Sequence, residues 1–141
     1  PLAGAVLVAP RLVRAATGTP VEVWKDPNCG CCKDWIEHMQ ANGFDVKALD
    51  VEDVDKVKKE RGVPVSAQSC HTGIVNGYAV EGHVPAAAVK KMLAEKPAIL
   101  GIAVPGMPMG SPGMEVPSGQ KDKFDVVAFD KAGKITIFVK G

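Results

Sequence analysis

Residues 21–36, which read VEVWKDPNCGCCKDWI, decide the fold. Residues 21–24 alternate apolar and polar side chains, as a half-buried strand does, and Asp26-Pro27-Asn28 follows as a turn. A helix is predicted from Cys32 to Asn42, with its apolar side chains on one face. Three cysteines therefore stand where a strand passes into the start of a helix.

The rest of the chain continues this alternation of strands and helices. We predict a strand over 44–51, a helix from Asp53 to about Lys59, a hairpin over 71–83 that turns at Asn76-Gly77, a helix from Pro85 to Glu95, and a final hairpin of 124–129 and 134–139. Residues 101–119 are rich in Gly, Pro and Met and are predicted to be a loop. The order strand, helix, strand, helix, strand, strand, helix is that of the thioredoxin fold. We therefore expect an α/β, thioredoxin-like mixed sheet with flanking helices, a Met-rich loop and a C-terminal β-hairpin extension.

Composition favours one globular domain without a nucleic-acid partner. The chain has 141 residues, of which 46% are hydrophobic. Outside residues 1–20 it carries 15 basic and 16 acidic side chains, a formal charge of −1. Such a balance does not attract nucleic acid. The basic run Lys58-Lys59-Glu60-Arg61 is predicted to be a solvated helix face.

The first 20 residues differ from the rest of the chain. Residues 1–9 are almost all apolar and small, a run too short to span a membrane. The run is typical of a secretory signal, with Ala15-Ala16 as a candidate cleavage point. An ordered N-terminal strand or a tag remnant is the alternative. We expect export to the periplasm, a single domain over residues 21–141 and no stable membrane span.

The run Cys29-Gly30-Cys31-Cys32 predicts a thiol site. Free N–H groups and a partial positive charge at a helix N-terminus favour thiolates, which attack disulfides and bind soft metals. Two sulfurs suffice for disulfide exchange, whereas three crowded thiolates repel one another unless a cation intervenes. Soft thiolates favour Cu(I), zinc or iron–sulfur centres. A structural disulfide between Cys29 and Cys32 is the alternative.

Cys70 is expected to face these cysteines. In the thioredoxin order, the residue just before the first hairpin strand packs against the C-x-x-C turn, a place that oxidoreductases give to a cis-proline. Counting outward from Asn76-Gly77 pairs Cys70 with His83 and places them on one side of the sheet. The same count turns His71 to the opposite side. His38 is predicted to be exposed on its helix.

Three methionines lie in the Gly/Pro-rich loop: Met107, Met109 and Met114. A loop of this kind packs poorly into a core but can carry mobile thioether ligands, which select Cu(I). The alternative is a loop whose methionines cover an apolar patch.

Four separated segments resemble the bacterial CopG copper-resistance family: WKDPNCGCCKDW at 24–35, SCHT at 69–72, YAVEGHVP at 78–85 and GMPMGSPGM at 106–114. The resemblance covers about residues 21–141. It implies a periplasmic thioredoxin-like protein that binds several copper ions through bridging cysteines and supports copper tolerance. It also implies a redox role, interconverting Cu(I) and Cu(II). The matching thiols are Cys29, Cys31, Cys32 and Cys70.

The leading hypothesis is therefore a polynuclear Cu(I) site, with copper ions and other periplasmic copper-handling proteins as partners. Its predicted ligands are Cys29, Cys31, Cys32, Cys70, His83, Met107, Met109 and Met114. A thioredoxin-like thiol–disulfide oxidoreductase is the second hypothesis. A zinc or iron–sulfur protein is the third, although the paired knuckles of zinc sites and the cysteine runs of ferredoxins are absent from the sequence.

Overall fold

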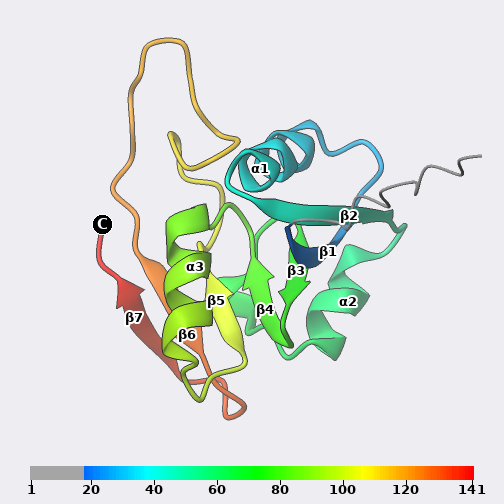
Figure 1. Ribbon diagram of the computed structural model, residues 1–141, viewed down its shortest axis with the longest axis vertical. Helices are drawn as coiled ribbons and strands as arrows, with labels where there is room; N and C mark the ends of the chain where they lie inside the picture. Colours follow the sequence, from blue (N-terminus) through cyan, green and yellow to red (C-terminus); the bar gives the residue numbers. More distant parts are fainter. Residues whose placement is uncertain (1–17) are drawn as a thin grey trace, which may run out of the picture.

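A seven-stranded mixed sheet forms the centre of the protein in a computed structural model that describes residues 18–141 (Figure 1). The strands are β1 (Thr19–Lys25), β2 (Phe44–Asp50), β3 (Thr72–Val75), β4 (Tyr78–Glu81), β5 (Gly101–Ala103), β6 (Val126–Phe129) and β7 (Ile135–Val139). The helices are α1 (Gly30–Ala41), α2 (Val54–Glu60), the short 3-10 turn η1 (Val65–Ala67) and α3 (Ala86–Glu95).

The strand order β2-β1-β3-β4-β5-β6-β7 contains the predicted thioredoxin-like unit. β1 pairs in parallel with β2 and antiparallel with β3, and β3 pairs antiparallel with β4. The hairpin turns at Asn76 and Gly77, whose φ angles of 46° and 82° are those of the predicted type I′ turn. The thioredoxin-like fold class is therefore confirmed.

Both faces of the sheet are covered. The larger core packs α1 and α3 on one face, with Trp35, Met39, Val89 and Met92 fully buried. A smaller core, which includes Val63 and Phe129, lies on the other face. Figure 1 shows α2 apart from α1 and α3. The predicted helices and hairpins thus exist, although α1 begins two residues earlier than expected.

Two predictions about local structure are wrong. Residues 101–103 form an interior strand, β5, between β4 and β6, instead of belonging to the loop. Three residues are too few for a periodic signal, and it is burial between neighbouring strands that makes them a strand. Lys58 is not on a solvated face: only 2% of it is exposed, and it pairs with Glu81.

The predicted export signal lies almost wholly outside the described residues. Of the segment 1–20, the structure describes only residues 18–20, and β1 already begins at Thr19. The ordered strand thus starts two residues before the predicted domain boundary. No helix within residues 18–141 is long and apolar enough to cross a membrane.

Gly101→Ala should destabilise the protein strongly. Gly101 pairs with Ala79 across β4 and β5, and an added methyl group would overlap the carbonyl oxygen of Ala79. Overpacking of this kind costs about 2 kcal/mol or more at a rigid backbone. The free energy of unfolding in urea measures the effect.

Gly30→Ala is the matched control, because a methyl group at Gly30 meets nothing within 4 Å. Its unfolding free energy should stay within about 1 kcal/mol of wild type. Equal losses in both variants would contradict the close approach of β4 and β5.

Candidate metal centre

The N-terminus of α1 carries three of the four cysteines. Cys29 is the last residue before the helix, with an extended backbone and no side-chain cap. Its N–H donates to the carbonyl of Asp26 (3.1 Å), which closes the turn after β1. Cys31 and Cys32 occupy the first helical turn. The three cysteines therefore stand at a helix end whose first N–H groups have no side-chain cap.

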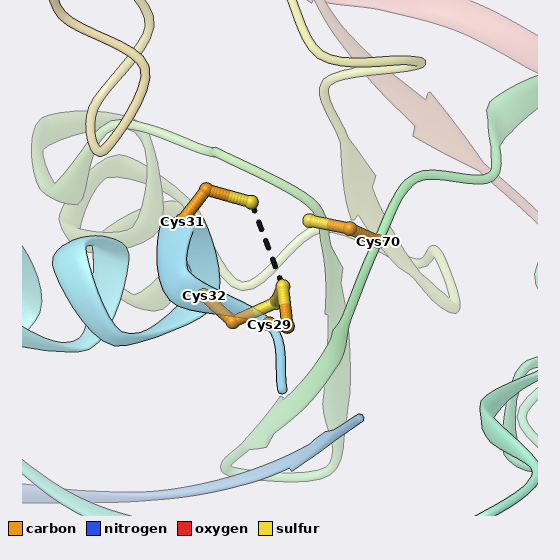
Figure 2. Close-up of side chains that lie close together, drawn as sticks. All are labelled: Cys29, Cys31, Cys32 and Cys70. Carbon is orange, nitrogen blue, oxygen red and sulfur yellow. Dashed lines mark hydrogen bonds between the residues drawn. A yellow bond between two sulfur atoms is a disulfide. The ribbon is translucent and has the colours of Figure 1, made fainter. Parts of the chain in front are cut away.

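Cys29 and Cys32 are joined by a disulfide, while Cys31 and Cys70 are free thiols (Figure 2). The sequence left this disulfide open as the alternative to four free thiolates. Cys31 Sγ lies 3.5 Å from Cys29 Sγ. The oxidised site thus offers two thiols, and reduction of the disulfide would release two more at the same place.

Cys70 lies opposite the first turn of α1, as the topology predicted. It precedes β3, and Figure 2 shows its sulfur pointing toward the other three. All four sulfur atoms lie within 4.8 Å of one another. Cys70 thus lies where the sequence topology expects the cis-proline of thiol oxidoreductases, and residues 18–141 contain no cis peptide bond.

Two histidines contact Cys70 in addition to the cysteines of α1. His83 Nε2 lies 3.0 Å from Cys70 Sγ, in agreement with the predicted pairing. His71 Nδ1 lies 3.2 Å from the same sulfur, so the prediction that His71 faces away is wrong. The paired residues of β3 and β4 end at Thr72 and Glu81. Beyond these pairs the N–H of Gly82 still donates to the carbonyl oxygen of His71 (3.0 Å). At this end of the sheet the side chains of Cys70 and His71 both reach one centre.

Both imidazoles are buried and favour the neutral form. Burial is the main cause that lowers the pKa of His83 and holds the pKa of His71 well below the usual value. His83 Nδ1 lies 2.7 Å from the carbonyl oxygen of Pro112, to which it donates. This hydrogen bond leaves the lone pair of Nε2 facing Cys70, the arrangement that metal-ligating histidines use. His71 Nε2 has no hydrogen-bond partner among the described residues.

Cys70 is a protonated thiol in the metal-free protein. Burial, followed by the proximity of Cys31, raises its pKa to about 12, and the smaller opposing effects include the Lys58 ammonium. A metal ion at this sulfur would therefore displace a proton. The protonated thiol thus avoids a negative charge in a buried place when no cation is present.

The Met-rich loop contacts the site at its centre. A methyl group at Gly113 would lie 2.8 Å from Trp35 N, 2.9 Å from Cys31 O and 3.1 Å from His83 Nδ1. Only glycine allows this approach. Met107 is 53% exposed, and Met109 and Met114 are half-buried on either side of the contact. The loop thus brings its methionines to the neighbourhood of the site, while their role as ligands stays a prediction.

The sequence predicted that His38 is exposed on its helix, and this prediction is wrong. His38 is half-buried, and its Nε2 accepts the N–H of Ala86 (3.0 Å) at the start of α3. Burial lowers its pKa, in keeping with an accepting, neutral ring. His38 therefore bridges two helices and takes no part in the cysteine–histidine cluster.

Sequence reasoning missed His71 as a member of the cluster. The signal available was its place directly after Cys70, at the end of a strand. Two overlapping donor sets result, and Cys70 belongs to both: Cys29, Cys31, Cys32 and Cys70 form one, and Cys70, His71 and His83 the other. The fold and this cluster define a thioredoxin-like protein with a candidate soft-metal centre.

Comparisons with known proteins agree with this class. Two solved structures match, named "Copper resistance protein copG- Form 2" and "Copper resistance protein copG- Form 1", with TM-scores of 0.83 and 0.82. Each is 47% identical, and each match covers 88% of this chain and 98% of that chain. The chain therefore belongs to the CopG family of copper resistance proteins. A family described as "Protein of unknown function, DUF411" matches residues 67–114. No curated protein sequence matches the chain.

The metal-free protein should lose stability in mild acid. The folded pKa of His71 lies well below the 6.5 of an ordinary histidine, so only the unfolded chain takes up a proton in this range. Stability is then complete above the unfolded pKa and falls as the pH drops below it, by at most about 1.4 kcal/mol per pH unit for this group. Urea unfolding between about pH 7.5 and 5 measures the slope.

His71→Phe supplies the comparison, because it keeps a ring against Trp35, whose centroid lies 4.4 Å from that of His71, and it does not titrate. Its stability should depend less on pH than that of wild type. Parallel slopes would show that His71 is not the group responsible.

Proposed function

We propose that the protein binds Cu(I) ions as cargo at the cysteine–histidine cluster and so supports copper resistance. One observation carries the proposal: the sulfur of Cys70 belongs at once to a set of four sulfurs and to a set with two imidazole nitrogens. Because a thiolate can bridge two metal ions, these sets would hold more than one copper ion. The names of the two similar structures support copper as the metal.

The donor chemistry fits copper. Thiolate sulfur selects Cu(I), and imidazole nitrogen is a good ligand for copper in both of its common oxidation states. The neutral His83 already presents the lone pair of Nε2 toward Cys70. The mixed donors also support the finer proposal that bound copper passes between Cu(I) and Cu(II). The chain's own residues would hold the ions, release the proton of Cys70 and exclude water.

Periplasmic location forms part of the proposal. The apolar run at residues 1–9 supports export. The family resemblance also supports it, because it implies a periplasmic protein. In an oxidising compartment the pair Cys29 and Cys32 would close to the disulfide unless copper or a reductant kept it open. Copper loading and disulfide formation then compete for the same two sulfurs.

Met107, Met109 and Met114 are proposed to help load or release Cu(I). The loop meets the site through Pro112 and Gly113, between the second and third of these methionines. Thioethers bind Cu(I) more weakly than thiolates do. A Cu(I) ion bound by these methionines could therefore pass on to the thiolates of the buried cluster. Exposed Met107 would meet a partner copper-handling protein first.

Thiol–disulfide exchange is the second candidate function. The disulfide between Cys29 and Cys32 at a helix start favours it. Against it stand Cys31, which lies beside the disulfide, and Cys70, in place of the cis-proline that holds a substrate chain. Rapid reduction of insulin by the metal-free protein would favour this function, and the absence of turnover together with tight copper binding would favour the first.

Reduced wild-type protein should bind more than one Cu(I) ion per chain. Cys70→Ser should lose about half or more of that copper, because it removes the shared sulfur. Metal analysis after anaerobic loading gives the stoichiometry, and competition with a chromogenic Cu(I) chelator gives the affinity.

His38→Gln is the control, since His38 contacts Ala86 instead of the cluster. It should bind copper as wild type does. No copper in the wild type, or full copper in Cys70→Ser, would contradict the proposed function. Brown protein with visible absorbance would indicate an iron–sulfur centre instead.

Replacing Met107, Met109 and Met114 together by Leu should slow Cu(I) loading from a weak chelator by about tenfold. This is the lower end of the effect that follows when groups supporting a metal site are removed. Leucine keeps the apolar volume and removes the thioether. Stopped-flow absorbance of the chelator measures the rate. Met92→Leu, in the buried core, is the control, and an unchanged rate in the triple variant would remove the methionines from the proposal.

A further inference from the structure

A buried ion pair lies beside the cluster on the other side of the sheet's end. Lys58 of α2 and Glu81 of β4 approach to 2.8 Å, and their side chains are 3% and 0% exposed. The desolvation of two charges offsets most of their attraction, so replacing such a pair by apolar residues is often neutral or stabilising. Stability alone therefore gives a weak reason for this pair.

The contacts of the pair converge on one short segment. Glu81 Oε2 accepts the backbone N–H of Ser69 (3.0 Å), and Glu81 Oε1 accepts the hydroxyl of Thr72 (2.5 Å). Lys58 Nζ also donates to the oxygen of Thr72 (3.2 Å). Ser69 and Thr72 are the two residues that flank Cys70 and His71, so one carboxylate ties down both ends of the segment.

The segment needs such a support, because the paired residues of β3 and β4 end at Thr72 and Glu81. Cys70 and His71 lie just beyond these pairs, where His71 keeps one backbone hydrogen bond to the hairpin, from the N–H of Gly82 to its carbonyl oxygen (3.0 Å). The carboxylate of Glu81 thus holds the chain on both sides of Cys70 and His71, through Ser69 and Thr72.

We infer that Lys58, Glu81 and Thr72 act as a positioning clamp that holds Cys70 and His71 in the geometry that copper requires. This inference rests on the proposed function, because it takes copper to bind at these donors. Glu81 supplies the acceptors, Thr72 is the tether at the strand end, and Lys58 compensates the buried negative charge. None of the three belongs to the two donor sets that could hold a metal ion. Their effect is to order two ligands before the ion arrives.

Thr72→Val tests the clamp with the least disturbance. It keeps the size of the side chain and the Lys58–Glu81 pair, and removes only the hydroxyl. We expect weaker Cu(I) binding, by about tenfold, as is usual when a group that orients metal ligands is lost. Thr72→Ser keeps the hydroxyl and should restore the affinity. Glu81→Gln, which keeps the shape but not the charge, should also bind more weakly.

Lys25→Met is the control for the general effect of breaking an ion pair that involves a buried side chain. Lys25 is 3% exposed, and its ammonium pairs with Asp50 at the end of β1 instead of hydrogen-bonding to residues 69–72. The variant should lose stability but keep the copper affinity of wild type. An affinity loss equal to that of Thr72→Val would show a general effect of stability and overturn the inference.

Two further measurements report position directly. In the metal-free protein, amide hydrogen exchange over residues 69–72 should be faster in Thr72→Val and Glu81→Gln than in wild type. In the copper-loaded protein, X-ray absorption at the copper edge should show fewer nitrogen neighbours in these variants. If Glu81→Gln does not fold, Thr72→Val alone carries the test.

The outcomes separate this inference from the proposed function. Wild-type protein that binds no Cu(I) would overturn both. If folded Thr72→Val binds Cu(I) with the affinity of wild type and with the same number of nitrogen neighbours, the clamp is overturned. The proposed copper site is unaffected by that result. Weaker binding in Thr72→Val, recovery in Thr72→Ser and no change in Lys25→Met would support the clamp.

Discussion

The packing of Trp35 against the sheet is the interaction on which the site depends. Trp35 stands three residues after Cys32 on α1 and is fully buried. Its indole N–H donates to the carbonyl of Val84 (2.9 Å), next to His83, and its ring packs on His71 at 4.4 Å between centroids. Apolar burial and one directional hydrogen bond thus hold α1 in a single position. The same side chain connects the cysteines of α1 to both histidines.

The cluster is built from the two sides of the sheet. α1 brings three sulfurs on the face that holds the larger core, while the opposite face contributes Lys58 and Glu81, which contact the residues around Cys70. The short segment 69–72 is where the two meet. Gly113 completes the arrangement, because without a side chain the Met-rich loop can lie directly against α1 and His83.

The chemistry of the metal-free site follows from its burial. Neutral imidazoles, a protonated Cys70 and the disulfide between Cys29 and Cys32 together place little net charge where water is scarce. Reduction changes the number of free sulfurs from two to four. A soft cation bound at these sulfurs would replace the protons that burial otherwise retains. The capacity for metal would therefore depend on the redox state of one cysteine pair.

The sequence by itself determined the order of strands and helices, the turn at Asn76-Gly77, the cysteines at a helix start and the approach of Cys70 and His83. These features rest on local patterns and turn chemistry, which act over a few residues. Only the tertiary structure decided the rest: the strand β5, the inward position of His71, the bridge made by His38 and the burial of Lys58. Each of these features depends on contacts between segments that are distant in the sequence. A local pattern of residues predicts neither the burial of a side chain nor the residue at which strand pairing ends.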